Sequence, residues 1–393
     1  MAANVLLVLP VRSYRAAAFL AAGRAIGARI VLATDRASSI GGTPEVIVDL
    51  DDPDAAAEAV AAFAEGHPVH GVVGVDETAV LPAAAIAARL GLRHHPVAAV
   101  AATRDKRLMR RRAAERGLRQ PAFAETRTGA GPAALEAAAG AVGGFPVVVK
   151  PVSLAASQGV LRADDPAALD GAARRIGRLL DRLGCAPADG AGHPLLVESF
   201  LPGREVAIEG IVRGGRLEVL RIFDKPDGLD GPTFAETLYV APSRLTPAVQ
   251  AAVAGLVAGA VSALGLDEGP VHAEVRVDPM TGPALVEVAA RSIGGLCSQA
   301  VRVCAADPDT LRPTGEPMSL EEVILRHALG MALPDRLTAC AGAAGVLMLP
   351  VERAGRLVAV DGVAAAAQVA GVDSVSIGVA AGTEVEPLPE GDR

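Results

Sequence analysis

Short apolar runs alternate with alanine-rich helical stretches through residues 1–100, and this alternation constrains the fold more than any other feature of the sequence. The expected order is strand, helix, strand, strand, helix, strand over residues 4–9, 14–26, 29–33, 46–48, 55–64 and 71–75. Parallel strands buried on both faces have this appearance. The sequence therefore predicts an α/β fold that begins with a small, doubly wound parallel sheet.

The first strand is not followed by the glycine fingerprint of a dinucleotide-binding domain, which argues against a Rossmann dehydrogenase. The pattern changes after Pro96, where we expect a charged helix from about Ala101 to Arg116 that is closed by Gly117. A domain boundary is accordingly expected near residue 100.

Strands and helices are mixed in the rest of the chain. Strands are expected at 145–150, 194–200 and 204–212, and helices at 163–184 and about 245–264. The tail beyond Gly342 has short apolar runs separated by Gly and Asp, which indicates a small C-terminal subdomain that contains strands.

Composition limits the classes of partner. Hydrophobic residues make up 51% of the chain but aromatic residues only 2%, so the core can be large and is expected to consist mainly of small and branched aliphatic side chains. The formal net charge is −8, and the one basic cluster, Arg104 to Arg112, is typical of a solvated helix face, so no nucleic-acid partner is expected. We find no stretch of 18 charge-free apolar residues and expect no membrane span.

Cysteine usage and the N-terminus both fit a reducing cytoplasm. Cys185, Cys297, Cys304 and Cys340 have neither the paired spacing of a zinc site nor the density of a secreted disulfide scaffold. The apolar run over residues 5–9 is too short for the core of a signal peptide.

A hairpin near residue 280 carries two glutamates that are expected to face each other. Polar and apolar residues alternate over residues 271–277, and a second strand, 284–288, follows the turn. If the turn is centred just after Met280, Glu274 lies directly opposite Glu287.

Two carboxylates that face each other across a ladder repel, so such a pair favours a compensating cation. Mg²⁺ suits the hairpin because it binds one or two carboxylates and completes its shell with water and phosphate oxygens. By strand parity Arg291 projects to the same side as Glu287 and would place a guanidinium beside the metal. An ordinary solvated hairpin face is the alternative.

Two segments upstream are compatible with phosphate binding, although each is a weak signal by itself. Lys150 ends an apolar strand, where a lone lysine is usually just solvated. Ser157 and Gly159 are suited to a small flap against phosphates, because glycine allows close approach of the backbone.

The strand–turn–strand segment of residues 195–205 offers a slot for a planar ring. Backbone groups around Glu198 and Leu201 would bind an adenine edge, and Glu205 would accept hydrogen bonds from ribose hydroxyls. A plain hairpin fits this segment equally well.

Taken in order along the chain, these elements resemble the ATP-grasp carboxylate–amine ligase superfamily. The resemblance rests on the order and spacing of Asp105-Lys106, Lys150-Pro151, Ser157 to Val160, Glu198 to Glu205, Glu274, and Glu287 to Arg291. It extends over nearly the whole chain and is closest to the L-amino-acid ligase branch, which joins amino acids into dipeptides.

The resemblance implies an α/β protein of three units. These are an N-terminal parallel-sheet domain at 1–100, a two-lobed α+β ATP-grasp domain at 101–300 with a small nucleotide-covering lobe at about 118–200, and a small β-containing C-terminal subdomain at 301–393.

The resemblance also implies roles for individual residues. ATP would be held by residues that contact its phosphates or its adenosine, namely Lys106, Lys150, Ser157, Gly159, Glu198, Phe200, Leu201 and Glu205. Glu274 and Glu287 would carry Mg²⁺, or Mn²⁺ in its place, and Arg291 would stabilise an acyl-phosphate. Glu236 would recognise a substrate amino group.

The chain departs from the family pattern in several places. Ala289 stands where many members carry Asn, so two carboxylates must hold the metal largely alone. Residues 154–156 lack the glycines common in the flap, which argues against a mobile flap. Gly294 and Gly295 stand where some relatives have bulk, which predicts a roomier acceptor pocket. The chain also ends soon after Leu388, where relatives usually continue.

The predicted function is an ATP-dependent ligase that joins a carboxylate, such as an amino acid, to an amine through an acyl-phosphate and releases ADP and phosphate. The alternatives are an ATP-grasp carboxylase or purine-pathway-like ligase with another nucleophile, and a catalytically idle nucleotide-binding protein. Expected partners are small-molecule carboxylates and amines in the cytoplasm, with neither nucleic acid nor membrane, and a homodimer is compatible with the sequence.

Overall fold

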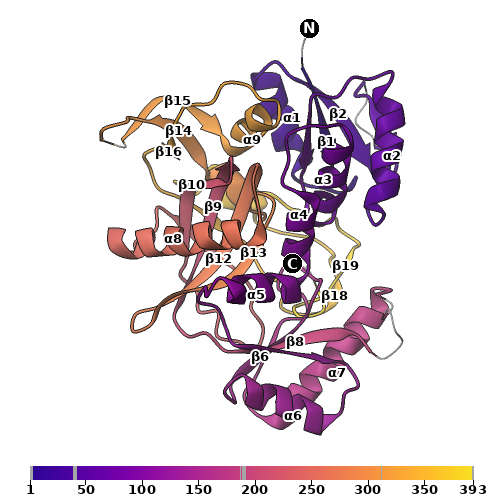
Figure 1. The fold of residues 1–393 in the computed structure, drawn as a ribbon, viewed down its shortest axis with the longest axis vertical. Helices are drawn as coiled ribbons and strands as arrows, with labels where there is room; N and C mark the ends of the chain where they lie inside the picture. Colours follow the sequence, from indigo (N-terminus) through magenta and orange to yellow (C-terminus); the bar gives the residue numbers. More distant parts are fainter. Residues whose placement is uncertain (1–2, 39–41, 186, 188–191, 311, 392–393) are drawn as a thin grey trace.

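The structure is a computed structural model that describes residues 3–38, 42–185, 187, 192–310 and 312–391 (Figure 1). The described strands form two four-stranded sheets, a six-stranded sheet, a three-stranded sheet and a two-stranded pair. An N-terminal unit and a small lobe lie at opposite ends of the molecule, and the six-stranded sheet lies between them.

The N-terminal sheet is parallel and has the strand order β3-β2-β1-β4. Its elements are β1 (Asn4–Val8), α1 (Ala16–Ala25), β2 (Arg29–Thr34), β3 (Glu45–Ile47), α2 (Pro53–Ala64), β4 (Gly71–Gly74), η1 (Glu77–Ala79) and α3 (Val80–Arg89). Alternate residues of β1 pack in different cores: Leu6 lies with Val60 of α2, and Leu7 lies with Phe19 of α1. Both faces of the sheet are therefore covered, and the predicted doubly wound parallel sheet is confirmed.

The small lobe is an antiparallel sheet covered by two helices, with the strand order β5-β8-β6-β7. Its elements are β5 (Phe123–Arg127), α6 (Pro132–Ala141), β6 (Val147–Pro151), β7 (Leu161–Ala163), α7 (Pro166–Arg182) and β8 (Pro194–Ser199). Helix α7 begins three residues after the predicted start, because the carboxylate of Asp165 accepts a hydrogen bond from the Ala168 amide and so caps the helix.

The six-stranded sheet is antiparallel and has the order β13-β12-β9-β10-β11-β17. Its strands are β9 (Arg204–Arg213), β10 (Arg216–Lys225), β11 (Leu238–Ala241), β12 (Gly269–Asp278), β13 (Gly282–Ala289) and β17 (Ala344–Leu347). Helices α4 (Val97–Arg104), α5 (Lys106–Glu115) and α8 (Pro247–Leu264) share one core with this sheet.

Helix α8 corrects the expectation that no charge-free apolar stretch of 18 residues exists. It has 18 residues without a charge and is long and apolar enough to cross a membrane by length and composition. In the structure its inner face, which includes Val253, Val257 and Val261, is buried in the core that it shares with the six-stranded sheet. Length and composition alone therefore do not distinguish this helix from a membrane span, and its burial in the structure is that of a core helix.

The charged helix expected from about Ala101 to Arg116 is wrong in one respect, because it is two helices. Asp105 has extended backbone angles and separates α4 from α5. Its carboxylate accepts hydrogen bonds from the amides of Arg107 and Leu108 and so caps α5. The basic cluster thus begins a new helix, with Lys106 in its first position.

The C-terminal part contains a three-stranded sheet of β14 (Arg302–Ala306), β15 (Pro313–Ser319) and β16 (Leu337–Ala339), together with η2 (Cys297–Ala300) and α9 (Leu320–Ala328). A disulfide joins Cys304 to Cys340, which the cysteine spacing did not predict. The two cysteines meet because the pairing of β14 with β16 brings residues that are 36 positions apart in the sequence to a Cα–Cα distance of 5.3 Å.

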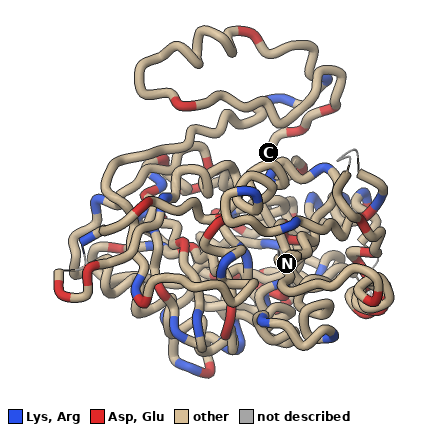
Figure 2. The backbone as a smooth tube through the Cα atoms, turned by 90° about the horizontal axis from the view of Figure 1, so that it is seen from above, with Lys and Arg blue, Asp and Glu red and all other residues tan. Residues whose placement is uncertain are grey.

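The last segment is mostly irregular. It contains β18 (Gly355–Arg356), α10 (Val363–Ala366) and β19 (Glu384–Val385). A long loop next to the C-terminus projects from the rest of the molecule (Figure 2). The chain then returns to the small lobe, where the amide of Gly159 donates to the Pro389 carbonyl at 2.9 Å and the Arg175 guanidinium pairs with Glu390.

Candidate active site

A large cavity of about 1590 Å³ lies between the small lobe, the six-stranded sheet and the N-terminal unit. Its walls include all but one of the predicted site residues: Lys106, Lys150, Ser157, Glu198, Phe200, Leu201, Glu205, Glu236, Glu274, Glu287, Arg291, Gly294 and Gly295. The exception is Gly159, whose left-handed backbone (φ +72°) packs against the ring of Pro151. Residues that are far apart in the sequence thus meet in one place.

Two buried lysines line the cavity. Lys106 begins α5, and its ammonium donates to the carbonyl of Leu154 at 2.5 Å and lies 3.6 Å from a Glu287 oxygen. Lys150 lies near the end of β6, and its ammonium is 2.7 Å from Glu198. Both side chains are only 6% exposed, so each is a poorly solvated cation that an anionic ligand would stabilise.

The carboxylate of Glu198 is held by two cations. Arg110 donates from Nε to Oε1 at 2.7 Å, and Lys150 lies 2.7 Å from Oε2. Burial alone would raise the pKa of Glu198, but Arg110 and Lys150 hold it at about 2. Burial lowers the pKa of Lys150 to about 8, because Glu198 offsets the loss of solvation only in part. The Glu198 side chain therefore binds the ammonium of Lys150. From the sequence, only the backbone around Glu198 was expected to take part, by binding adenine.

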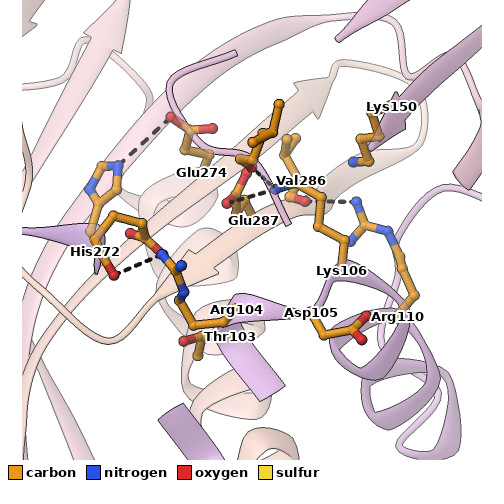
Figure 3. Close-up of polar contacts among 12 residues, drawn as sticks. Thr103, Arg104, Asp105, Lys106, Arg110, Lys150, His272, Glu274, Val286 and Glu287 are labelled. Atoms are coloured by element: carbon orange, nitrogen blue, oxygen red, sulfur yellow. Dashed lines mark hydrogen bonds and ion pairs between the residues drawn. The ribbon is translucent and has the colours of Figure 1, made fainter. Parts of the chain in front are cut away.

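Arg110 was missed by the sequence analysis, which placed it on a solvated helix face. Its side chain is fully buried. Beyond Glu198 it reaches the backbone of the glutamate hairpin, where Nη2 donates to the carbonyl of Val286 at 2.7 Å (Figure 3). A signal was available, because α5 has a buried face of Lys106, Met109, Arg110 and Ala113 at helical spacing.

The glutamate hairpin has the expected pairing for an unexpected reason. Glu274 lies opposite Glu287, but Asp278 pairs with Gly282, so the turn is centred on Met280 itself. A β-bulge between the two glutamates and the turn inserts one residue and restores the predicted pair. Both glutamates line the cavity.

A third lysine lies among three glutamates beside this hairpin. The Lys225 ammonium is 2.7 Å from both Glu205 and Glu274, and it also pairs closely with Glu236. Oxygens of these three carboxylates all lie within 4.8 Å of one another. Burial alone would lower the pKa of Lys225, but Glu205 and Glu274 raise it well above its ordinary value. The side chain of Glu205 is thus engaged by a lysine, whereas a ribose contact was predicted for it.

Lys225 could have been found from composition. The chain has 37 lysines and arginines, but lysine occurs only at positions 106, 150 and 225. All three lysines are buried, and all three contact a glutamate of the cavity wall. All three lysines of the chain are thus buried, compact cations, whereas its arginines occur both on the surface and in buried positions such as Arg110.

A buried histidine on strand β12 of the hairpin lies between two carboxylates. His272 lies 3.5 Å from Glu209 and 3.7 Å from Glu274. Glu209 is 0% exposed, and burial raises its pKa. Its other contact is the amide of Ile293, which donates to it at 2.9 Å and ties the loop after Arg291 to the sheet. Glu209 was not predicted, because a buried glutamate looks the same in the sequence as an exposed one.

Arg291 is engaged with the N-terminal unit. Its Nε donates to Glu77 of η1 at 2.5 Å, and Glu77 also contacts Arg104 at 3.2 Å. Burial alone would raise the pKa of Glu77, but Arg291 and Arg104 lower it to about 2. Glu77 thereby orients the guanidinium that strand parity predicted beside the hairpin, and no pattern in the sequence pointed to this partner.

The space beside Gly294 and Gly295 corrects the expectation of a roomier pocket. The amide of Gly295 donates to the Tyr14 hydroxyl at 2.6 Å. A Cβ on Gly294 would lie 3.2 Å from that hydroxyl, and one on Gly295, which has φ +61°, would lie 2.5 Å from the sulfur of Met348. Tyr14 and Met348 therefore fill the volume that bulkier residues at these positions would take.

Residues 153–160 form the loop that was expected to act as a phosphate flap. Ala156 and Ser157 both have left-handed backbone angles, with φ of 56° and 59°. Such angles are unfavourable for residues other than glycine. The loop is also held at Leu154 by Lys106 and at Gly159 by the C-terminal segment. These contacts support the prediction that the flap is less mobile than a glycine-rich one.

The segment that was predicted to bind adenosine is flanked by cations. The ring of Phe200 lies 4.4 Å from the Arg162 guanidinium and 5.4 Å from that of Arg276. Arg276 also lies 3.9 Å from Glu205. Phe200 is therefore a fixed part of the cavity wall.

Comparisons with known proteins match three parts of the chain. Residues 143–300 match the ATP-grasp domain, residues 20–94 the ATP-grasp N-terminal domain, and residues 347–393 the L-amino acid ligase C-terminal domain 2.

Among curated proteins, the alanine–anticapsin ligase of Bacillus subtilis (strain 168) is 28% identical over 250 residues, which are 60% of this chain and 51% of the relative. The matched region thus spans about half the length of the curated relative.

Among solved structures, an L-amino acid ligase from Bacillus licheniformis superposes with a TM-score of 0.81 and 27% identity, covering 98% of this chain and 90% of the other. The biotin carboxylase domain of a Hydrogenobacter thermophilus 2-oxoglutarate carboxylase, solved with MgADP and bicarbonate, has a TM-score of 0.67 at 15% identity and covers 98% and 83%. The second likeness concerns the fold alone.

Proposed function

The chain belongs to the ATP-grasp superfamily, and on that premise we propose that it is an ATP-dependent carbon–nitrogen ligase. It would join the carboxyl group of an amino acid or similar small acid to an amine and release ADP and phosphate. The observation that carries this proposal is that Lys106, Lys150, Glu274, Glu287 and Arg291 line one cavity. We also propose the division into units at 1–100, 101–300 and 301–393.

The cationic side of the cavity is proposed to bind the phosphates of ATP. Lys106 and Lys150 are poorly solvated and already paired with carboxylates of the wall, so they are held in place before the ligand arrives. Ser157 would contact the phosphates from the small lobe, and Gly159 would shape the loop that carries it. Phosphoryl transfer needs this kind of fixed positive charge, because catalysis consists mainly of positioning and electrostatic stabilisation.

Adenosine is assigned to the wall formed by the 198–205 segment. Phe200 and Leu201 lie on the cavity and offer apolar surface for a planar ring. Glu198 and Glu205 would act here through the cations they bind, since Arg110, Lys150 and Lys225 already engage their carboxylates.

Glu274 and Glu287 fit a divalent cation that accompanies ATP. They are opposed on neighbouring strands, both face the cavity, and their side chains are 18% and 29% exposed. Carboxylate oxygens beside a phosphate site are the donors that Mg²⁺ prefers, and Mn²⁺ accepts the same set. When bound, the ion would neutralise charge on the phosphates. Because Ala289 supplies no oxygen, these two residues would hold the ion together with water and ATP.

The proposed chemistry has two steps. The substrate carboxylate attacks the γ-phosphorus of ATP and forms an acyl-phosphate, and the bond to ADP breaks. The amine nitrogen then attacks the acyl carbon, loses a proton, and phosphate leaves. Arg291, oriented by Glu77, would bind the acyl-phosphate, since a guanidinium pairs well with phosphate oxygens.

The substrate side of the cavity lies between the N-terminal unit and the loop after Arg291. Glu236 is proposed to recognise a substrate amino group, although Lys225 engages it in the structure. Gly294 and Gly295 would border the acceptor pocket, whose size is set by Tyr14 and Met348.

A scan of phosphate release over pairs of amino acids and small carboxylic acids, followed by mass spectrometry of the product, tests the proposal. We expect ADP and phosphate to form only when a carboxylate is present, and an amide product when an amine is added. Glu287→Ala should abolish this release and leave the thermal unfolding transition in place. Turnover that requires bicarbonate and ignores amino acids would contradict the proposal.

A further inference from the structure

Strand β13 contains one residue more than a regular ladder accommodates. Glu287 pairs with Glu274, but the next pair toward the turn is Leu285 with Val275, so Val286 is the extra residue. Leu285 and Val288 both pack in the core shared with α8, and Val286 and Glu287 both line the cavity. In a regular strand Glu287 would share the face of Leu285. The bulge therefore turns the Glu287 carboxylate from the core into the cavity.

The guanidinium of Arg110 holds this bulge. Its Nη2 donates to the carbonyl of Val286 at 2.7 Å, and the contact is drawn in Figure 3. The extra residue of a bulge is left out of the ladder, so its partly buried carbonyl lacks a ladder partner and is suited to another donor. Arg110 supplies that donor from a side chain that is 0% exposed.

The same guanidinium sets the position of a lysine on the opposite wall. Arg110 donates to both oxygens of Glu198, at 2.7 Å from Nε and 3.3 Å from Nη2, and Glu198 binds the Lys150 ammonium at 2.7 Å. Gln120 fixes Arg110 in turn, because its amide nitrogen donates to the Arg110 carbonyl at 2.7 Å. One buried cation thus reaches both the small lobe and the glutamate hairpin.

We propose that Arg110 is a positioning residue that fixes the positions of Glu287 and Lys150 relative to each other. Glu287 can then bind the cation while Lys150 binds the phosphates of the same ATP molecule. This inference rests on the proposed function. A planar guanidinium can donate to a carboxylate and a carbonyl at once in fixed directions, whereas lysine is a single point charge. The conservative change to lysine should therefore keep the buried charge and lose the geometry.

Arg110→Lys is the direct test, and Arg112→Lys is its matched control. Arg112 lies on the same helix and also donates to a backbone carbonyl, that of Leu264 at 2.8 Å, away from the cavity. ATP binding is measured by calorimetry at a series of Mg²⁺ concentrations. Arg110→Lys should raise the Mg²⁺ concentration needed for half-maximal binding by about 10- to 100-fold, the usual effect of removing a group that orients a metal ligand. Arg112→Lys should leave it unchanged.

Hydrogen exchange in the metal-free protein gives a second readout that does not depend on ATP. The amides of residues 282–289 should exchange faster in Arg110→Lys than in the wild type, because the bulge has lost its donor. If Arg110→Lys does not fold, Gln120→Ala is used in its place to test whether the position of Arg110 matters. This variant removes the hydrogen bond to the Arg110 carbonyl but retains every buried charge of the network. It should produce both changes in the same direction and to a smaller extent.

An unchanged Mg²⁺ requirement with unchanged exchange in β13 would overturn the role of Arg110 and leave the proposed function standing. A wild-type protein that binds no ATP at any Mg²⁺ concentration would refute the proposed function instead. In that case the exchange of residues 282–289 still decides whether Arg110 holds the bulge.

Discussion

At the scale of single residues, the site is built from charges that are buried in pairs or groups. Lys225 illustrates the physics, since its side chain is 3% exposed and its ammonium lies among Glu205, Glu236 and Glu274. Removing one partner of such a buried group is costly, because the remaining charges are left uncompensated in a poorly solvated place.

Lys225→Met should therefore destabilise the protein by roughly 3–5 kcal/mol at pH 7. Without the ammonium the three carboxylates repel, and protonation relieves that repulsion. Lys225 holds the pKa of Glu274 well below its ordinary value in the wild type, although burial alone would raise it, so Glu274 contributes stability that is present above pH 4.5 and lost as the pH falls further. The variant lacks this contribution.

The measurement is the melting temperature of both proteins between pH 8 and pH 2, because the contribution of Glu274 is lost only below pH 4.5. We expect the difference between wild type and Lys225→Met to narrow as the pH falls. A difference that stays constant over this range would show that the charge of Lys225 does not stabilise the carboxylates.

At the scale of elements, local sequence often fixed where an element begins, and tertiary contacts fixed its register. Asp165 and Thr246 accept hydrogen bonds from the first turns of α7 and α8, as sequence rules for helix caps lead one to expect. The register of β13 depends on Arg110, and the pairing of β14 with β16 brings two cysteines together.

The Cys304–Cys340 disulfide should stabilise the C-terminal sheet by about 2–4 kcal/mol, because it closes a loop of 36 residues in the unfolded chain. We expect dithiothreitol to lower the melting temperature of the wild type. A double variant, Cys304→Ser with Cys340→Ser, should already melt at the lower temperature and be insensitive to reductant.

Cys185→Ser is the control for this experiment, because Cys185 is a free thiol. It should respond to dithiothreitol as the wild type does. Equal melting temperatures for the wild type with and without reductant would contradict the assigned role of the disulfide.

At the scale of the whole molecule, ion pairs connect units that are distant in the sequence. Glu77 follows the last strand of the parallel sheet, and Arg291 follows the glutamate hairpin, so their contact ties the N-terminal unit to the six-stranded sheet. Their side chains are 19% and 17% exposed, so removing one partner should cost more than it would in a surface salt bridge.

Glu77→Gln should cost roughly 3 kcal/mol at pH 7, because Arg291 loses its carboxylate partner. The pKa of Glu77 is lowered to about 2, since Arg291 and Arg104 outweigh the effect of burial. Its contribution is therefore fully present above pH 4.5 and is lost between pH 4.5 and pH 2. Urea unfolding midpoints of the two proteins should converge over that interval.

The control is Glu58→Gln in the same unit. Glu58 pairs with Arg89 at the surface, where the side chains are 71% and 54% exposed, and such pairs contribute little. Its unfolding midpoint should match the wild type at every pH. A Glu77→Gln variant as stable as Glu58→Gln would mean that the pair with Arg291 does not join the two units.

The sequence by itself determined the parallel sheet and the order of the ATP-grasp elements, because periodicity, capping and motif spacing are local properties of the chain. The predicted pairing of Glu274 with Glu287 is present only because a bulge at Val286 shifts the register of β13. Only the tertiary structure decided which partners those residues meet. Arg110, Glu209, Glu77 and Lys225 each contact a partner that lies between about 50 and 210 positions away in the sequence. Burial changes a charge from a solvated group into one that must be paired, and burial is a property of the folded chain alone.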